Sequence, residues 1–195
     1  MVKPSARQSV LRHPALWLWL LVIFVGIQLG AGLYEKIVVV PLWESVPGGD
    51  VLDRMHSSGM YAAGRSFWPF VSMPVALLAV VNLILAWRSR APHRRWWLAA
   101  AGIMVGYAVF SYGYFVPQML MLQSAADGWA PERVESVVDW WTSLNHLRLL
   151  LGVCGWLCAL KALSLLGPGV TARDRSSAPA EAPARPSPST APSAR

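Results

Sequence analysis

Long apolar runs alternate with short polar segments along the chain, and four runs are long enough to cross a lipid bilayer. They cover residues 15–34, 67–87, 96–122 and 140–163. A helix needs about 20 apolar residues to cross about 30 Å of hydrocarbon. Backbone polar groups cannot stay unpaired in lipid, so these spans must be helical. The pattern therefore predicts an all-α membrane protein, a bundle of four transmembrane helices.

The composition agrees with this and divides the chain into three parts. Hydrophobic residues make up 55% of the chain and charged residues only 14%, against about 25% charged residues in soluble domains. The first apolar run has no charge over its whole length and exceeds the about 7–15 residues of a signal-peptide core. We therefore expect a cytoplasmic tail over residues 1–14 and a transmembrane domain over 15–166. Residues 167–195, rich in Ala, Pro, Ser and Arg, predict a disordered cytoplasmic tail.

Lys and Arg are distributed unevenly between the segments that connect the spans. Twelve lie at the two chain ends and in the segment 88–95, namely Lys3, Arg7, Arg12, Arg88, Arg90, Arg94, Arg95, Lys161, Arg173, Arg175, Arg185 and Arg195. Four lie on the other side, namely Lys36, Arg54, Arg65 and Arg133. The positive-inside rule then places both termini in the cytoplasm of a plasma-membrane protein. The net charge of +7 is explained by this topology, so we expect no nucleic-acid partner.

The fourth span carries polar residues at helical spacing. Trp141, Asn145 and Arg148 fall on one face of a helix. A charge inside the bilayer costs about 2.5–3.5 kcal/mol on the insertion scale. We therefore expect Arg148 to face the bundle interior and to have a partner, with Glu35 the nearest carboxylate and Asp139 and Glu135 as rivals.

Other spans place polar residues at a similar depth. They are Gln28, Ser72, Tyr107, Ser111, Tyr112 and Tyr114. This layer indicates either a pocket open to the exterior or a buried network that sets the helix register. The segment 35–66 would form a structured outer loop over it, in which the β-branched run 37–40 could extend the first helix or form a short strand.

Few standard sites are present. The chain has no His-x-x-x-His, no Cys-x-x-Cys and no phosphate-binding glycine loop, so no metal site and no cofactor is evident. Cys154 and Cys158 are expected to be small apolar packing residues. The pairs Gly26-x-x-x-Gly30 and Gly102-x-x-x-Gly106 predict close helix packing within the bundle, or association into homo- or hetero-oligomers.

Three short motifs resemble a known family. The pair Tyr34-Glu35, the sequence Pro41-x-Trp43 and the motif Trp141-x-x-x-Asn145-x-x-Arg148 are similar to those of small four-span membrane proteins that include the anthrone oxygenases. The likeness covers about residues 15–166. The family is mostly uncharacterised bacterial proteins, and the resemblance implies oxidation of anthrones to anthraquinones with molecular oxygen.

The sequence leaves three functions open. The first is a membrane oxygenase acting on a lipophilic aromatic small molecule. The second is a non-enzymatic scaffold or partner-binding subunit in the lipid bilayer, and the third is a small transporter component. For the first we expect the binding residues to be Arg148, Asn145, Trp141, Glu35, Tyr34, Gln28, Tyr114 and Trp43.

Overall fold

A computed structural model describes residues 14–125 and 128–166, and throughout these residues the regular structure is helical, with no strand. The elements are α2 Pro14–Tyr34, η1 Glu35–Val39, α3 Pro41–Glu44, α4 Val51–Ser57, α5 Met60–Arg88, α6 Arg94–Phe110, η2 Ser111–Phe115, α7 Val116–Ala125 and α8 Pro131–Ser164. The two η elements are π-helices. The two predicted cytoplasmic tails lie outside the described residues, apart from Pro14, the first residue of α2.

Four continuous helical stretches are long and apolar enough to cross a membrane, as predicted. They are Pro14–Glu44, Met60–Arg88, Arg94–Ser124 and Pro131–Ser164, with 31, 29, 31 and 34 residues. Each is longer than the apolar run that predicted it, because a helix can continue into water with polar residues once it has left the hydrocarbon. The chain is therefore a multi-pass membrane protein.

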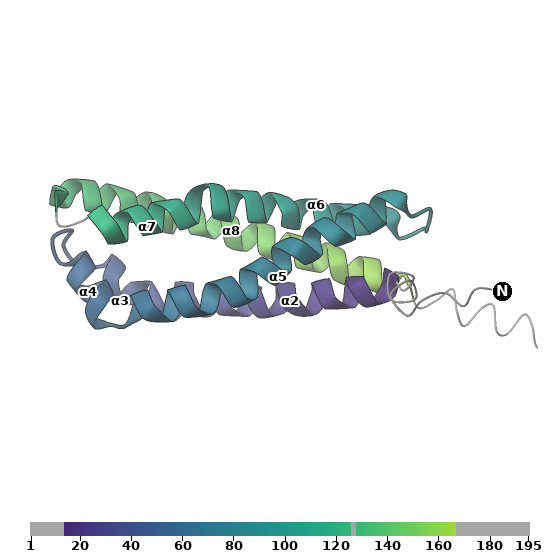
Figure 1. Ribbon diagram of the computed structural model, residues 1–195, viewed down its shortest axis with the longest axis horizontal. Helices are drawn as coiled ribbons and strands as arrows, with labels where there is room; N and C mark the ends of the chain where they lie inside the picture. The colour runs from purple at the N-terminus through teal and green to yellow at the C-terminus, as the bar shows by residue number, and fades with distance from the viewer. Residues whose placement is uncertain (1–13, 126–127, 167–195) are drawn as a thin grey trace, which may run out of the picture.

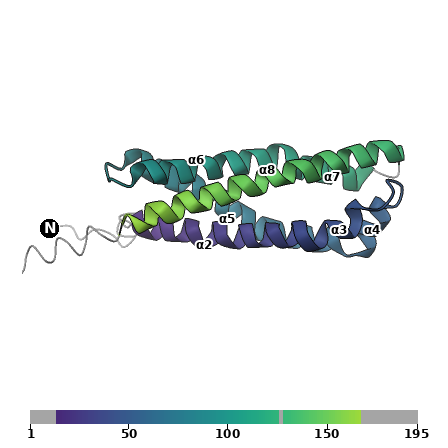
Figure 2. The same ribbon diagram turned by 180° about the vertical axis from the view of Figure 1, so that it is seen from behind.

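The four helices cross in pairs. α5 runs diagonally over one face of the bundle, from beside α2 at the end that carries α3 and α4 to beside the start of α6 (Figure 1). α8 runs diagonally over the opposite face and packs on α6 and α2 (Figure 2). We call the end with α3, α4 and the start of α8 the α4 end. The other end carries the basic turn between α5 and α6.

The connection between the first two membrane helices is helical as well. The β-branched run continues α2 as the π-helix η1, so it extends the helix and forms no strand. Pro41 then begins α3, where its missing N–H costs nothing. Gly59 has a φ of 71°, the left-handed conformation that glycine adopts readily, and it starts α5. The position of Gly48 against α8 is also fixed, because its N–H donates a hydrogen bond to the Glu135 side chain at 2.9 Å.

Two hydrophobic clusters hold the bundle together. One lies toward the basic turn and contains a satisfied polar group: Asn82 donates to the carbonyl of Trp17 at 3.0 Å and accepts from Trp97 Nε1 at 2.8 Å. The other lies at the α4 end, where Trp43 and Met55 are fully buried beside Trp141. The short helices α3 and α4 thus cover this end of the bundle.

Most of the glycine contacts predicted within the bundle are wrong, whereas the alternative, association into oligomers, stays a prediction. A Cβ added to Gly30, Gly102 or Gly106 would meet nothing within 4 Å, because these positions face outward. Gly26 alone of the four approaches a neighbour, the Trp156 ring at 3.3 Å. Among the glycines of the four membrane helices, the tightest contact is instead at Gly155 of α8, where a Cβ would lie 2.6 Å from Met104 Sδ of α6.

Candidate functional site

The predicted polar face of α8 is directed into the bundle. Trp141, Asn145 and Arg148 are 6%, 0% and 8% exposed, whereas Asp139 and His146 are on the exposed side of the helix. The 100° rotation per residue therefore placed these side chains correctly. Arg148, the single cation of the three, lies one turn further into the membrane than Asn145.

Glu35 is the partner of Arg148, as expected from its place at the end of the first span. Arg148 Nη2 donates to Glu35 Oε2 at 3.5 Å, and Trp68 Nε1 on α5 donates to Glu35 Oε1 at 3.2 Å. The guanidinium carbon also lies 4.8 Å from the centre of the Phe115 ring and 5.7 Å from that of Trp68. The two rival carboxylates do not compete, because Glu135 binds the Gly48 N–H and Asp139 is exposed.

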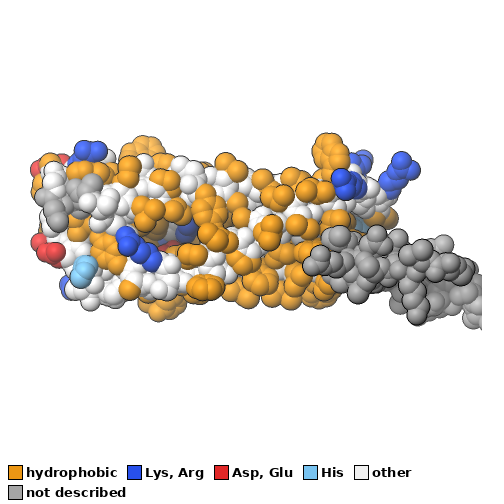
Figure 3. Space-filling view, viewed as in Figure 1, with side chains coloured by type: hydrophobic (Ala, Val, Ile, Leu, Met, Phe, Trp, Pro, Cys, Tyr) orange, Lys and Arg blue, Asp and Glu red, His pale blue; other side chains and the backbone are white. Residues whose placement is uncertain are grey.

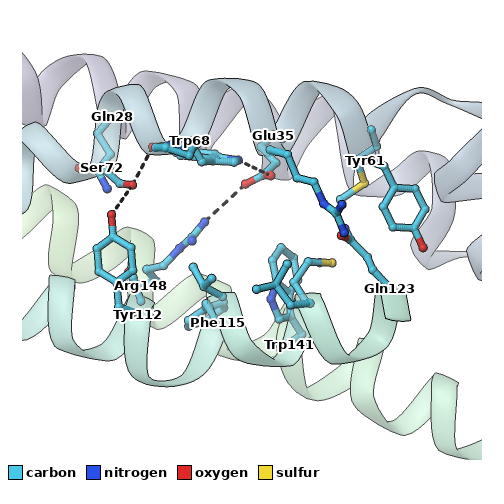
Figure 4. A pocket seen from close by; sticks show the side chains of 18 of the residues that line it. Gln28, Glu35, Tyr61, Trp68, Ser72, Tyr112, Phe115, Gln123, Trp141 and Arg148 are labelled. Atoms are coloured by element: carbon cyan, nitrogen blue, oxygen red, sulfur yellow. Dashed lines mark hydrogen bonds and ion pairs between the residues drawn. The ribbon is translucent and has the colours of Figure 1, made fainter. Parts of the chain in front are cut away.

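The pair lies on the wall of a cavity of about 340 Å³ (Figure 4). α5 and η2–α7 form two of its sides, and α2, η1 and α8 contribute the rest. Its aromatic side chains are Tyr61, Trp68, Tyr112, Phe115 and Trp141, and its charged side chains are Glu35, Arg65 and Arg148. The volume suits a small molecule of a few fused rings.

Both π-helices border this cavity. η1 begins at Glu35, and η2 begins at Ser111 and ends at Phe115. A π turn widens an α-helix locally and recurs at functional sites. Here the two wide turns present a carboxylate and an aromatic ring to the same guanidinium.

Three buried polar atoms beside the cavity make no hydrogen bond of ordinary geometry within the described residues, although the side chains of two of these residues, Gln28 and Ser111, interact with Tyr107. They are Gln28 Oε1, Ser111 Oγ and Arg148 Nε, and all three residues line the cavity and are less than 9% exposed. Leaving a buried polar group without a partner costs about 1–3 kcal/mol. These atoms have almost no accessible surface, so a bound molecule would reach them only after a movement of their side chains.

The structure brings half of the predicted binding residues to the cavity. Gln28, Glu35, Trp141 and Arg148 line it. Asn145 and Trp43 are fully buried beside it, and the Trp43 ring packs on Trp141 with centroids 5.9 Å apart. Tyr114 stacks on Phe110 in the cluster at the α4 end, and Tyr34 is 62% exposed on the outside of α2.

Some lining residues were missed by sequence reasoning. Trp68 and Phe115 are not among the binding residues expected from the sequence. Arg65 and Gln123 are at the rim of the cavity, where they form a 3.3 Å hydrogen bond across it. The two π turns shift the face of a helix, and a regular helical projection from the sequence has no signal for that shift.

The comparisons with known proteins point to one family. Residues 58–158 match the family model described as anthrone oxygenase, which confirms the resemblance noted in the sequence. The matched part is just over half of the chain and includes the motif on α8, but not Glu35. Searches of the curated proteins and of the solved structures found no match.

Proposed function

The chain belongs to the anthrone oxygenase family, and on that premise we propose that its cavity binds a lipophilic polycyclic phenol or ketone and oxidises it with molecular oxygen. The observation that carries the proposal is the environment of Arg148. Arg148 lines a cavity with largely aromatic and aliphatic walls, and its hydrogen bond to Glu35 at 3.5 Å uses only one of its five N–H donors. A planar, fixed cation of this kind suits a phenolate or enolate oxygen, to which it can donate two parallel bonds.

The chemistry requires one proton to leave the substrate carbon. In an anthrone the CH₂ group opposite the ring carbonyl becomes a second carbonyl. One atom of O₂ enters the product, and the other leaves as water with the two hydrogens. Removing the first proton moves negative charge onto the ring oxygen, where a fixed donor stabilises it.

We assign the two halves of this step to the buried pair. Arg148 would hold the ring oxygen, helped by the hydroxyl of Ser111, which lines the same cavity and can donate a hydrogen bond. Glu35 would accept the proton, because its carboxylate lies in the same cavity and is oriented by Trp68 at 3.2 Å. Trp68 and Phe115 would stack on the substrate rings, since both already flank the guanidinium.

The orientation in the membrane is part of the proposal. Twelve Lys and Arg at the basic-turn end and the tails, against four at the α4 end, favour cytoplasmic termini in the plasma membrane. The cavity, which lies toward the α4 end, would then be in the outer half of the bilayer. A structured loop made of α3 and α4 would cover it on the outside.

The experiment is turnover of 1,8-dihydroxyanthrone by purified protein in lipid nanodiscs, followed by quinone absorbance and oxygen uptake. Arg148→Lys keeps the charge beside Glu35 and loses the planar fork, so we expect kcat to fall about 10²-fold, as for loss of one oxyanion donor. Glu35→Gln removes the proton acceptor and should lower kcat by about 10²–10⁴-fold.

Arg133→Lys is the matched control, because Arg133 lies over the Trp129 ring, 4.1 Å from its centre, and away from the cavity. It should keep wild-type turnover. Arg148→Lys and the control should melt within a few degrees of the wild type, which separates chemistry from folding for the residue that carries the proposal. Wild-type turnover by Arg148→Lys would refute the assignment, and absence of turnover by the wild type would refute the function.

A further inference from the structure

We infer that the cavity opens sideways into the bilayer, through a slot between α5 and η2–α7, and that its lipophilic ligand enters from the lipid. The inference rests on the proposed function only in taking the ligand to be a hydrophobic ring system. The slot itself is a property of the packing. α5 packs on α6 and α2, whereas α7, which continues η2, packs on α8, and the α5 and α7 segments diverge toward the α4 end (Figure 1).

The rims of the slot are apolar and face outward. Met73 on α5 and Val116 and Leu120 on α7 line the cavity and are also 60%, 41% and 46% exposed. Met73 lies inside the charge-free run 67–87, and the other two lie inside the run 96–122. Because both runs are apolar enough to cross a membrane, we expect these exposed side chains to contact lipid chains.

Two hydrogen bonds across the slot mark its ends. Ser72 and Tyr112 share one at 2.8 Å on the side of the basic turn, and Arg65 donates the other to Gln123 at 3.3 Å on the side of the α4 end. Ser72 is seven positions after Arg65, which is about 10 Å along α5. Between these two bonds the rims include the apolar lining residues Pro69, Val116, Met119 and Leu120, and Met73 lies one residue beyond Ser72.

The α3–α4 segment covers part of the cavity at the α4 end. Trp43, Val51 and Met55 of the α3–α4 segment are at most 1% exposed and pack with Phe115 and Trp141 over the α4 end. The space-filling view shows the face between α5 and α7 hollowed, with basic and acidic atoms visible between apolar rims (Figure 3). A molecule that dissolves in lipid can therefore reach Arg148 without crossing the cover at the α4 end.

The first test needs no ligand. Met119→Cys, in a background without Cys154 and Cys158, places a bimane label on the cavity wall. Brominated phosphatidylcholine should quench this label about as well as one at Leu77→Cys, which is 67% exposed on the apolar run of α5 and outside the cavity. Strong quenching by aqueous iodide, as for a label at the exposed Ser58→Cys, with little quenching by the lipid, would overturn the inference.

The second test narrows the slot. Val116→Trp puts a large ring on its rim, and Val109→Trp is the control, because Val109 is 68% exposed on α6 and does not line the cavity. Stopped-flow binding of 1-hydroxyanthraquinone in phosphatidylcholine nanodiscs measures both rates. For Val116→Trp we expect association and dissociation to slow together, by about tenfold, with Kd unchanged. The control should keep the wild-type rates.

Failure of the lateral route and failure of the proposed function give different results. Wild-type rates for Val116→Trp, in a protein that still oxidises 1,8-dihydroxyanthrone, would refute the lateral route and leave the function intact. Lipid quenching at Met119→Cys, in a protein without turnover, would support the route and refute the function.

Discussion

At the residue scale, Arg148 and Glu35 explain each other's presence inside a membrane helix. Either charge alone would cost free energy inside the membrane. Together, and with Trp68, the two side chains satisfy part of each other's hydrogen bonding. A buried ion pair adds little net stability compared with a well-packed apolar pair, because desolvation offsets the attraction. Its position on a cavity wall is therefore better explained by binding than by folding.

This energetic balance predicts a double-mutant cycle. Arg148→Leu leaves the Glu35 carboxylate buried without its cation, and we expect a loss of about 3–5 kcal/mol in stability. The double variant Arg148→Leu/Glu35→Leu removes both charges and should recover most of the wild-type melting temperature in detergent. Turnover should be absent in both.

The outcome separates the two interpretations that the sequence left open, a pocket and a network that sets the helix register. A register network would leave the double variant as unstable as the single one, since the pair would then specify the packing. A stable but inactive double variant indicates a site.

At the element scale, packing between α6 and α8 depends on the small residues of α8. Gly155 meets Met104 and Ile103, and Gly152 lies beside Leu29 and Tyr107. The sequence predicts contacts at two pairs of glycines that are four residues apart. The contact that α8 makes instead uses Gly152 and Gly155, which are three residues apart. Which face of a helix meets its neighbour depends on the crossing of the whole bundle.

We expect Gly155→Leu to lower the unfolding free energy by about 1–3 kcal/mol, because the larger side chain overpacks the contact with Met104. Gly106→Leu is the matched control, since a Cβ there would meet nothing within 4 Å. Thermal melts in one detergent compare them. A lower melting temperature for Gly106→Leu would mean that this outward face of α6 packs against another molecule.

At the scale of the whole molecule, charge and cavity are separated along the bundle axis. The basic turn and the Asn82 cluster are at one end, and the cavity lies toward the α4 end under the short helices. The distribution of Lys and Arg sets the proposed orientation of the bundle in the membrane. The same orientation therefore decides which leaflet the slot opens into. The substrate would come from the outer leaflet.

Single cysteines test this topology in a background without Cys154 and Cys158. We expect Ser58→Cys at the α4 end to react with a membrane-impermeant maleimide in intact cells. Ser89→Cys, beside the basic turn, should react only after the cells are opened. Labelling of Ser89→Cys in intact cells would invert the orientation and place the slot in the inner leaflet.

The sequence by itself determined the number of spans, their helical state and the buried face of α8. These follow from local rules, because lipid forces backbone hydrogen bonds inside each segment and a helix repeats every 3.6 residues. The pair Arg148–Glu35 could also be predicted, since a charge at that depth needs a partner and few carboxylates lie near it.

Only the tertiary structure decided where the cavity is and which residues line it. The divergence of α5 from α7 and the wide turns at η1 and η2 brought Trp68 and Phe115 to the guanidinium and left Tyr34 outside. The outward face of Gly102 and Gly106 was decided in the same way. Crossing angles and π turns arise from packing summed over all the helices, so a regular projection of one helix does not contain them.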